Sequence, residues 1–232
     1  MSLAEFVRRH DPDRFLTALF APPDKRDALL TLYAFNHELA RAREAVSEPP
    51  LALIRLQWWR EVVEGAQRRH EVAEPLLALL DQGLLQRDDL LAMIDAREAE
   101  VEPDFESVEE WRAYVSGTAG GLAVAAGRLL GVPEPERLRP LGIAYGIAGL
   151  LRSETVHARQ GRRLLPAGMS VEQLAAEGLG LLQPVTVPRH AIAALLPAVL
   201  ARRDLRHVPN FPVQRGLGDR LAVVLAGLAG RV

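Results

Sequence analysis

The 232-residue chain has no cysteine, only one lysine, and aromatic residues that make up just 5% of its sequence. Without cysteine it can form neither a disulfide nor a thiolate metal site, and it has no cysteine nucleophile. Its net charge is −2 and its pI is near 6.3, so its overall charge does not indicate the concentrated basic surface that nucleic-acid binding requires. These absences exclude disulfide-stabilised folds and argue against a nucleic-acid partner.

The chain also lacks a long hydrophobic run. Its most apolar segment extends from Leu141 to Leu151 and is bracketed by Arg139 and Arg152, whereas a membrane-spanning helix needs about 20 such residues. The first residues, MSLAEFVRRHDPDRF, do not contain the apolar core of a signal peptide. We therefore expect a cytoplasmic protein without a transmembrane segment, and peripheral contact with a membrane remains open.

The hydrophobic pattern is helical along almost the whole chain. Apolar residues recur at helical spacing, as at Leu53, Leu56, Trp59 and Val63, and period-two alternation never persists beyond a few residues. Helices are predicted over residues 22–46, 51–69, 74 onward, 88 or 89 to 103, 107–131, 137–159, 170–178, 188 onward and 216 onward. The fold class is therefore all-α, and because no linker divides the pattern we expect a single domain over residues 1–232.

Glycine and alanine are concentrated in residues 117–127. Each glycine weakens a helix by about 1 kcal/mol relative to alanine, so their density predicts a close approach to the backbone of another helix. The stretch lies inside a predicted helix and not between a strand and a helix, which argues against a phosphate-binding loop. Ser107, followed three residues later by Glu110, predicts a capping box at the start of this helix.

Two stretches carry a resemblance to a known family. Tyr33 to Glu44 reads YAFNHELARARE, and Gly146 to Pro166 reads GIAGLLRSETVHARQGRRLLP. Both resemble the squalene/phytoene synthase family, in which two prenyl diphosphates are joined with the help of Mg²⁺ held by two aspartate-rich helices. The family's aspartates correspond in this sequence to Ala40, Arg41, Glu44, Ser153 and His157.

The resemblance extends in collinear order from Asp13 to Arg206. The words AFNHELAR, RLQWWRE, IDARE and HARQGRRLLP resemble a divergent branch of the family that includes the mitochondrial complex I assembly factor and its bacterial relatives. The resemblance implies the all-α isoprenoid synthase bundle, with a central cavity between antiparallel helices. The pocket positions that it implies are Tyr33, Phe35, Ala40, Arg41, Glu44, Arg152, Ser153, His157 and Arg162.

The residue types at the aspartate positions are poor ligands for Mg²⁺. This ion takes oxygen ligands, usually carboxylates together with substrate phosphates, and it neutralises the charge that develops on a diphosphate leaving group. Only Glu44 retains a carboxylate, while Ser153 and His157 offer a hydroxyl and an imidazole one helical turn apart. We therefore predict neither a metal site nor a cofactor. Cationic residues that could still hold a phosphate or another anion are Arg41, Arg152, Arg162 and Arg163.

Several functions remain open on the sequence. The missing aspartates favour a non-catalytic protein that holds a prenyl or lipid-like ligand, or that assists the assembly of a respiratory complex by contacting one of its subunits. The alternative is an active prenyl-diphosphate transferase whose Mg²⁺ is bound by residual carboxylates, and a helical scaffold without a ligand is a third class. The residual carboxylates are Glu38, Glu44, Glu154, Asp95 and Glu98. Asp95, Glu98 and Glu102 share one helical face, for which a solvated acidic face is favoured over a replacement metal site.

Overall fold

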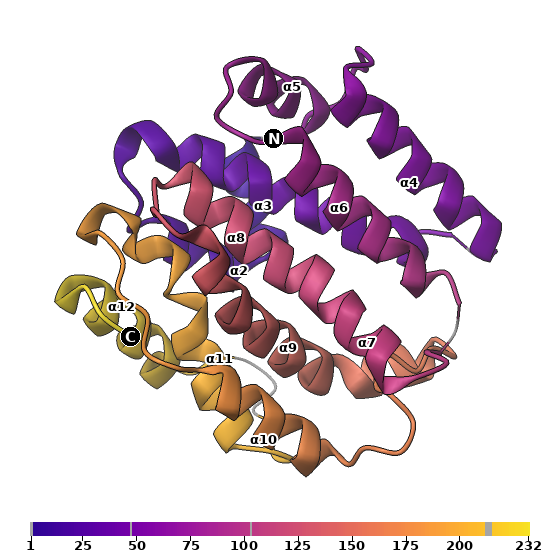
Figure 1. The fold of residues 1–232 in the computed structure, drawn as a ribbon, viewed down its shortest axis with the longest axis vertical. Coiled ribbons are helices and arrows are strands. Elements are labelled where there is room, and N and C mark those ends of the chain that lie inside the picture. Colours follow the sequence, from indigo (N-terminus) through magenta and orange to yellow (C-terminus); the bar gives the residue numbers. More distant parts are fainter. Residues whose placement is uncertain (1, 47, 103, 212–214) are drawn as a thin grey trace.

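The computed structural model of the chain describes residues 2–46, 48–102, 104–211 and 215–232. All regular structure in these residues is helical, which confirms the predicted all-α class (Figure 1). The α-helices are α1 (Leu3–His10), α2 (Pro12–Ala18), α3 (Pro23–Glu44), α4 (Pro49–Glu64), α5 (Ala73–Asp81), α6 (Arg87–Arg97), α7 (Val108–Val115), α8 (Gly121–Leu129), α9 (Arg139–Arg159), α10 (Val171–Leu181), α11 (Pro197–Arg206) and α12 (Leu217–Ala229). Three 3₁₀ helices cover Glu98–Glu100, Pro135–Leu138 and Arg189–Ala194, and a π-helical turn, η2, covers Ser116–Gly120.

The two longest helices, α3 and α9, form the centre of the bundle. α3 begins at Pro23, and proline is tolerated there because a backbone N–H at the first position of a helix has no partner within the helix. The carboxylate of Asp24 complements the positive end of the helix dipole. α3 packs against α1, α4, α5 and α8, whereas α9 packs against α8, α10 and α11. Because α8 contacts both, it connects the two halves of the bundle (Figure 1).

Close packing around η2 depends on glycine. A Cβ atom at Gly142 of α9 would lie 2.5 Å from the carbonyl oxygen of Ala119, and one at Gly117 would lie 2.4 Å from the Cβ atom of Ala96. Neither position has room for a side chain, so the small residues of 117–127 bring the helices together as predicted. The structure adds a feature that the sequence did not reveal, since the helix predicted over residues 107–131 passes through a π-helical turn between α7 and α8.

Some helix boundaries differ from those expected. α4 ends at Glu64 and not near residue 69, because Gly65 adopts a left-handed conformation with φ of 118°. Ser107 caps α7, but the carboxylate of Glu110 accepts a hydrogen bond from the Glu106 N–H at 2.7 Å, so only half of the predicted capping box forms. The helix predicted from residue 188 begins as a 3₁₀ helix, and α1 and α2 were not predicted at all. Residue 103, where the helix from residue 88 or 89 was predicted to end, lies outside the described residues.

The apolar segment Leu141–Leu151 forms the buried part of α9, as predicted, with Leu141, Ile147 and Leu151 in the core. Across the described ranges, no helix combines the length and the apolar character needed to cross a bilayer.

Candidate functional site

A cavity of about 230 Å³ lies between α3 and α9. Asn36, His37 and Ala40 line it from α3, and Tyr145 and Gly149 are among the residues that line it from α9. Residues of α2, α6, α7 and η2 complete the wall. The two helices that carry the family-like stretches therefore face each other across a central pocket, as the resemblance implied.

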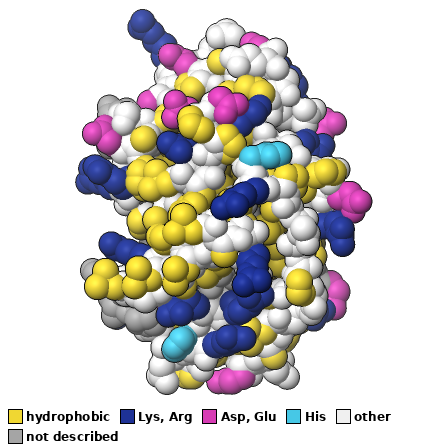
Figure 2. Space-filling view, turned by 90° about the vertical axis from the view of Figure 1, so that its left-hand side faces the viewer, with side chains coloured by type: hydrophobic (Ala, Val, Ile, Leu, Met, Phe, Trp, Pro, Cys, Tyr) yellow, Lys and Arg dark blue, Asp and Glu magenta, His cyan; other side chains and the backbone are white. Residues whose placement is uncertain are grey.

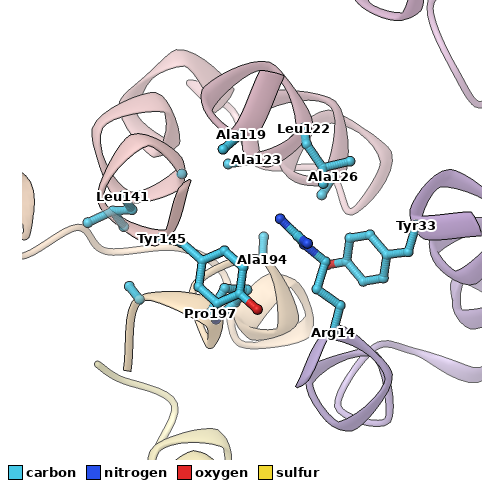
Figure 3. A pocket seen from close by; sticks show the side chains of 12 residues that line it. Arg14, Tyr33, Ala119, Leu122, Ala123, Ala126, Leu141, Tyr145, Ala194 and Pro197 are labelled. Atoms are coloured by element: carbon cyan, nitrogen blue, oxygen red, sulfur yellow. The ribbon is translucent and has the colours of Figure 1, made fainter. Parts of the chain in front are cut away.

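The inner end of this space is filled by an arginine. Arg14 of α2 extends between Tyr33 and Tyr145, with its guanidinium carbon 4.6 Å from the ring centroid of Tyr145 and 5.8 Å from that of Tyr33 (Figure 3). The wall beside the guanidinium is formed by small apolar residues such as Ala119 and Ala123 (Figure 3). The free volume that remains is about 20 Å³, which is room for about one water molecule.

The charge of Arg14 is held inside the protein by Asp11. The Asp11 carboxylate accepts a hydrogen bond from Arg14 Nη1 at 2.8 Å and also caps α2 by accepting one from the Arg14 backbone N–H at 3.0 Å. Burial alone would lower the pKa of Arg14, but the negative charge of Asp11 and the hydrogen bond to its carboxylate favour the charged form and raise that pKa above its ordinary value. Arg14 is therefore a permanent cation, and burial raises the pKa of Tyr33 to about 12, so that the phenol beside it stays neutral.

A second buried cation reaches the cavity from α6. Arg97 Nη2 lies 3.4 Å from the side-chain oxygen of Asn36, and Arg97 Nη1 pairs with the buried carboxylate of Glu100. Tyr114 donates its hydroxyl hydrogen to the same carboxylate, and Arg162 Nη2 lies 3.5 Å from its other oxygen. Burial would lower the pKa of Arg97, but the charge of Glu100 raises it. Glu100 therefore holds two arginines and a tyrosine in one buried cluster.

His37 lies at the rim of the cavity. Its ring is 4.8 Å from that of His10 and 5.4 Å from that of Phe6, and its Nε2 atom has no hydrogen-bond partner among the described residues. Burial, together with the nearby His10 and the positive charge of Arg41, lowers the pKa of His37 to about 4. His37 is therefore neutral at neutral pH.

The pocket positions implied by the first stretch occupy different environments. Tyr33 and Ala40 line the central space. Phe35 is fully buried away from the cavity, where its ring meets the Trp59 ring at 5.4 Å in an edge-on contact. Arg41 and Glu44 are exposed to solvent. The structure therefore brings only two of these five positions to the cavity wall.

The pocket positions implied by the second stretch lie beyond the cavity. Arg152 pairs with Asp204 of α11 at 3.1 Å. Ser153 donates a hydrogen bond to the Gly149 carbonyl at 2.7 Å and lies 3.4 Å from Nδ1 of His157. Burial lowers the pKa of His157, and Arg162 belongs to the Glu100 cluster. α9 instead presents Tyr145, Gly146, Gly149 and Leu150 to the cavity.

The residues around the cavity do not fit Mg²⁺. Within the described ranges, no three His, Asp or Glu side chains lie close enough to hold a metal ion together. The one carboxylate on the cavity wall, Asp11, is already bound to Arg14. The acidic face predicted from residues 95, 98 and 102 includes two carboxylates that already have a cationic partner. Asp95 of α6 and Glu98 of the following 3₁₀ helix both pair with Arg60, at 2.6 Å and 2.8 Å.

Sequence reasoning did not single out the residues that give the cavity its charge. Arg97 lies within the family-like word IDARE, which could have drawn attention to it. Arg14 occurs near the start of the chain, in a segment that only tertiary packing places inside the bundle. Glu100 was overlooked because its neighbours Glu98 and Glu102 fit one helical face, whereas the 3₁₀ turn after α6 directs Glu100 inward.

Comparison with known proteins identifies the fold family. The sequence profile of the squalene/phytoene synthase family matches residues 7–202. This chain belongs to the squalene/phytoene synthase family. Its fold is also that of a dehydrosqualene synthase (TM-score 0.81, 14% identity, 98% of this chain and 94% of the other) and of a squalene synthase from Alicyclobacillus acidocaldarius (TM-score 0.61, 18% identity, 98% and 88%).

The known proteins whose sequences are similar to this chain include two kinds. One is the NADH dehydrogenase (ubiquinone) complex I assembly factor 6 of Bos taurus, 27% identical over 70% of this chain and 51% of its own length, and its Drosophila melanogaster homologue, 30% identical over 69% and 52%. The other is the presqualene diphosphate synthase of Rhodopseudomonas palustris, 26% identical over 80% and 68%. The chain spans about half the length of the assembly-factor relatives that it matches.

Proposed function

We propose that this protein is a non-catalytic member of its family, a single domain that acts as an assembly factor of the respiratory complex I type. The observation that carries the proposal is the charge of the central cavity, where Arg14 and Arg97 approach the space between α3 and α9. The similarity to complex I assembly factor 6 supports the same function. We further propose a cytoplasmic location with peripheral contact to the membrane.

The chemistry of diphosphate release explains why this charge matters. Catalysis in the family requires Mg²⁺ to be gathered beside the leaving group, and a dication next to two fixed guanidinium groups is repelled unless carboxylates outnumber them. Asp11 and Glu100 are each committed to an arginine. The positions at which the resemblance places the family's aspartates hold Ala40, Arg41, Glu44, Ser153 and His157, so we propose that the metal-binding motifs have been lost.

The dimensions of the cavity suit a small ligand better than a prenyl chain. Pockets for small organic molecules usually measure about 300–1,000 Å³, and the central cavity measures about 230 Å³ with its apolar end closed by Arg14. A prenyl chain that entered the apolar end of this cavity would have to displace Arg14. The partner that we propose is therefore a subunit of the respiratory complex, contacted through the surface.

Two measurements test the absence of catalysis. The protein should release no pyrophosphate from farnesyl or geranylgeranyl diphosphate in the presence of Mg²⁺, whereas the Rhodopseudomonas palustris synthase serves as the active control. Titration calorimetry should detect no Mg²⁺ binding in the micromolar range. Pyrophosphate release above the background without enzyme would contradict the proposal.

The assembly role needs a separate test in cells. Deletion of the gene in its natural host should reduce the amount of assembled NADH dehydrogenase seen by native electrophoresis, and the wild-type gene should restore it. A chain carrying Arg14→Met should restore it as well if the cavity is not a catalytic centre and the variant accumulates to the normal level. Normal assembly in the deletion strain would contradict the assembly role while leaving the absence of catalysis untouched.

An active transferase is the second candidate, favoured by the similarity to presqualene diphosphate synthase over 80% of this chain. It would need its residual carboxylates to bind Mg²⁺. Glu44 and Glu154 are exposed, Asp95 and Glu98 are paired with Arg60, and Glu38 faces a separate pocket beside Trp59. These groups do not converge on the central cavity, so the pyrophosphate assay is expected to decide against this candidate.

A further inference from the structure

The last helix, α12, carries an exposed stripe of leucines. Leu217, Leu221, Leu225 and Leu228 are 78%, 58%, 65% and 63% exposed, respectively. Their spacing of four, four and three residues places them on one side of the helix. We call these four residues the leucine stripe. Large apolar side chains that gather on one exposed face mark a contact site for a protein or a membrane.

α12 is docked rigidly by its opposite side, so the stripe cannot simply turn inward. Val223 and Gly227 are buried, and a Cβ atom at Gly227 would lie 2.4 Å from the ring of Phe20, in the turn that follows α2. Asp219 near the start of α12 pairs with Arg203 of α11 at 2.5 Å. A helix that is apolar on both sides is stable in water only when both sides are covered, and the described residues cover one.

The C-terminal segment that carries the leucine stripe is rich in positive charge. Residues 189–232 contain seven arginines against two aspartates, a net charge of +5 in a chain whose overall charge is −2. Both aspartates, Asp204 and Asp219, are buried and ion-paired, so the exposed charged side chains among the described residues of this segment are arginines. Figure 2 shows hydrophobic side chains lying among Lys and Arg side chains on the face to which α12 belongs.

Three of these arginines are exposed and make no ion pair with any residue in the described ranges: Arg206, Arg220 and Arg231. Arg189 donates a hydrogen bond to the Leu228 carbonyl at 3.2 Å, which holds a further cation beside the stripe. An apolar helix face bordered by arginines complements a membrane surface, where acyl chains accept the leucines and anionic headgroups attract the cations. In a two-fold dimer the same patch would meet its own copy and bring like charges together.

We propose that the leucine stripe and its surrounding arginines form a docking surface for an anionic lipid bilayer, on which the protein lies peripherally. α12 would lie in the plane of the interface, with the leucines inserted at the boundary between headgroups and acyl chains. This inference does not depend on the proposed assembly role, since it rests only on the exposed residues of the C-terminal segment.

Vesicle sedimentation tests the proposal directly. The protein should sediment with phosphatidylcholine vesicles that contain about 30% phosphatidylglycerol, and at least about tenfold less with phosphatidylcholine alone. Binding should weaken strongly in about 1 M NaCl, where the Debye length is about 3 Å. Equal binding to both vesicles, or no binding to the anionic ones, would overturn the proposal.

Matched variants locate the surface. The double variant Leu221→Glu, Leu225→Glu should lose at least about tenfold in vesicle binding, while Ile54→Glu on α4, a residue 64% exposed, should bind as the wild type does. Arg220→Glu with Arg231→Glu keeps the leucines and should lose binding as well. Circular dichroism will show that each variant is folded. Unchanged vesicle binding by either double variant would overturn the proposal. It would also be overturned if light scattering showed that the wild-type protein is a dimer and that the leucine double variant is a monomer.

Discussion

The central cavity and the α12 surface both combine arginines with apolar side chains, but the arginines are paired with carboxylates only in the cavity. In the cavity each arginine pairs with a carboxylate, Arg14 with Asp11 and Arg97 with Glu100. Around α12, Arg220 and Arg231 have no acidic partner among the described residues and remain in water. A buried charge is tolerated only with a partner, because its desolvation costs several kcal/mol, whereas an exposed charge needs none.

This contrast indicates which substitutions in this protein should affect folding and which should affect its contacts with a binding partner. The charged side chains inside the bundle stabilise the fold, because each arginine there is paired with a carboxylate. The exposed arginines and leucines of α12 contribute little to folding and are therefore available for binding. The predictions below compare matched positions from the two kinds of environment.

The largest effect is expected from Glu100→Gln. Neutralising this carboxylate leaves the buried guanidinium groups of Arg97 and Arg162 without compensation, which should lower the free energy of unfolding by about 3–5 kcal/mol. The control is Glu98→Gln in the same 3₁₀ helix, whose exposed pair with Arg60 should contribute at most about 1 kcal/mol. Urea unfolding measures both. Similar losses for the two variants would show that the Glu100 cluster is not the buried network described above.

Gly142→Ala should be the next most damaging change. Its new methyl group would lie 2.5 Å from the Ala119 carbonyl oxygen, so α9 must shift away from η2 at a cost of about 1–3 kcal/mol. Gly149→Ala on the same helix meets nothing within 4 Å, and there alanine should be neutral or should stabilise the helix by up to about 1 kcal/mol. Thermal unfolding of the pair checks the prediction, which fails if both glycines tolerate alanine equally.

A smaller effect is expected from pH. Because burial lowers the pKa of His37 to about 4, the unfolded chain binds a proton at this histidine between about pH 6.5 and 4 while the folded chain does not. The stability associated with neutral His37 is therefore complete above pH 6.5 and is lost as the pH falls towards 4. The full pKa shift corresponds to about 3 kcal/mol, and the partial exposure of the ring to solvent reduces the expected loss to about 2 kcal/mol.

The contribution of His37 is isolated by substitution. His37→Gln should show a shallower loss of stability over the same pH range, measured by urea unfolding at several pH values. A pH dependence identical to that of the wild type would indicate that other groups account for it.

The smallest effect on folding is expected on α12. Leu221→Ala should change the free energy of unfolding by no more than about 0.5 kcal/mol, because the side chain is exposed, whereas Leu122→Ala in the core should cost about 2–5 kcal/mol. Comparable losses at the two positions would mean that the leucine stripe is covered within the folded chain.

The helical class and the family-like stretches could be predicted from the sequence, since helix formation depends on local spacing, capping and proline positions. The facing arrangement of the helices that carry Tyr33–Glu44 and Gly146–Pro166 followed from the resemblance. The predicted closeness of the helices at residues 117–127 also held, because glycine density reports backbone contact even when the partner is unknown.

The contents of the cavity could not be predicted in this way. Arg14 lies 19 residues before Tyr33 and about 130 before Tyr145, and only the packing of α2 against the bundle places its guanidinium between their rings. The position of α9 likewise determines that Gly149 lines the cavity while Ser153 turns back to its own helix. The sequence by itself determined the elements and the residues available for chemistry. Which charges are buried together was decided only by the tertiary structure, because charge pairing depends on contacts between segments that are distant along the chain.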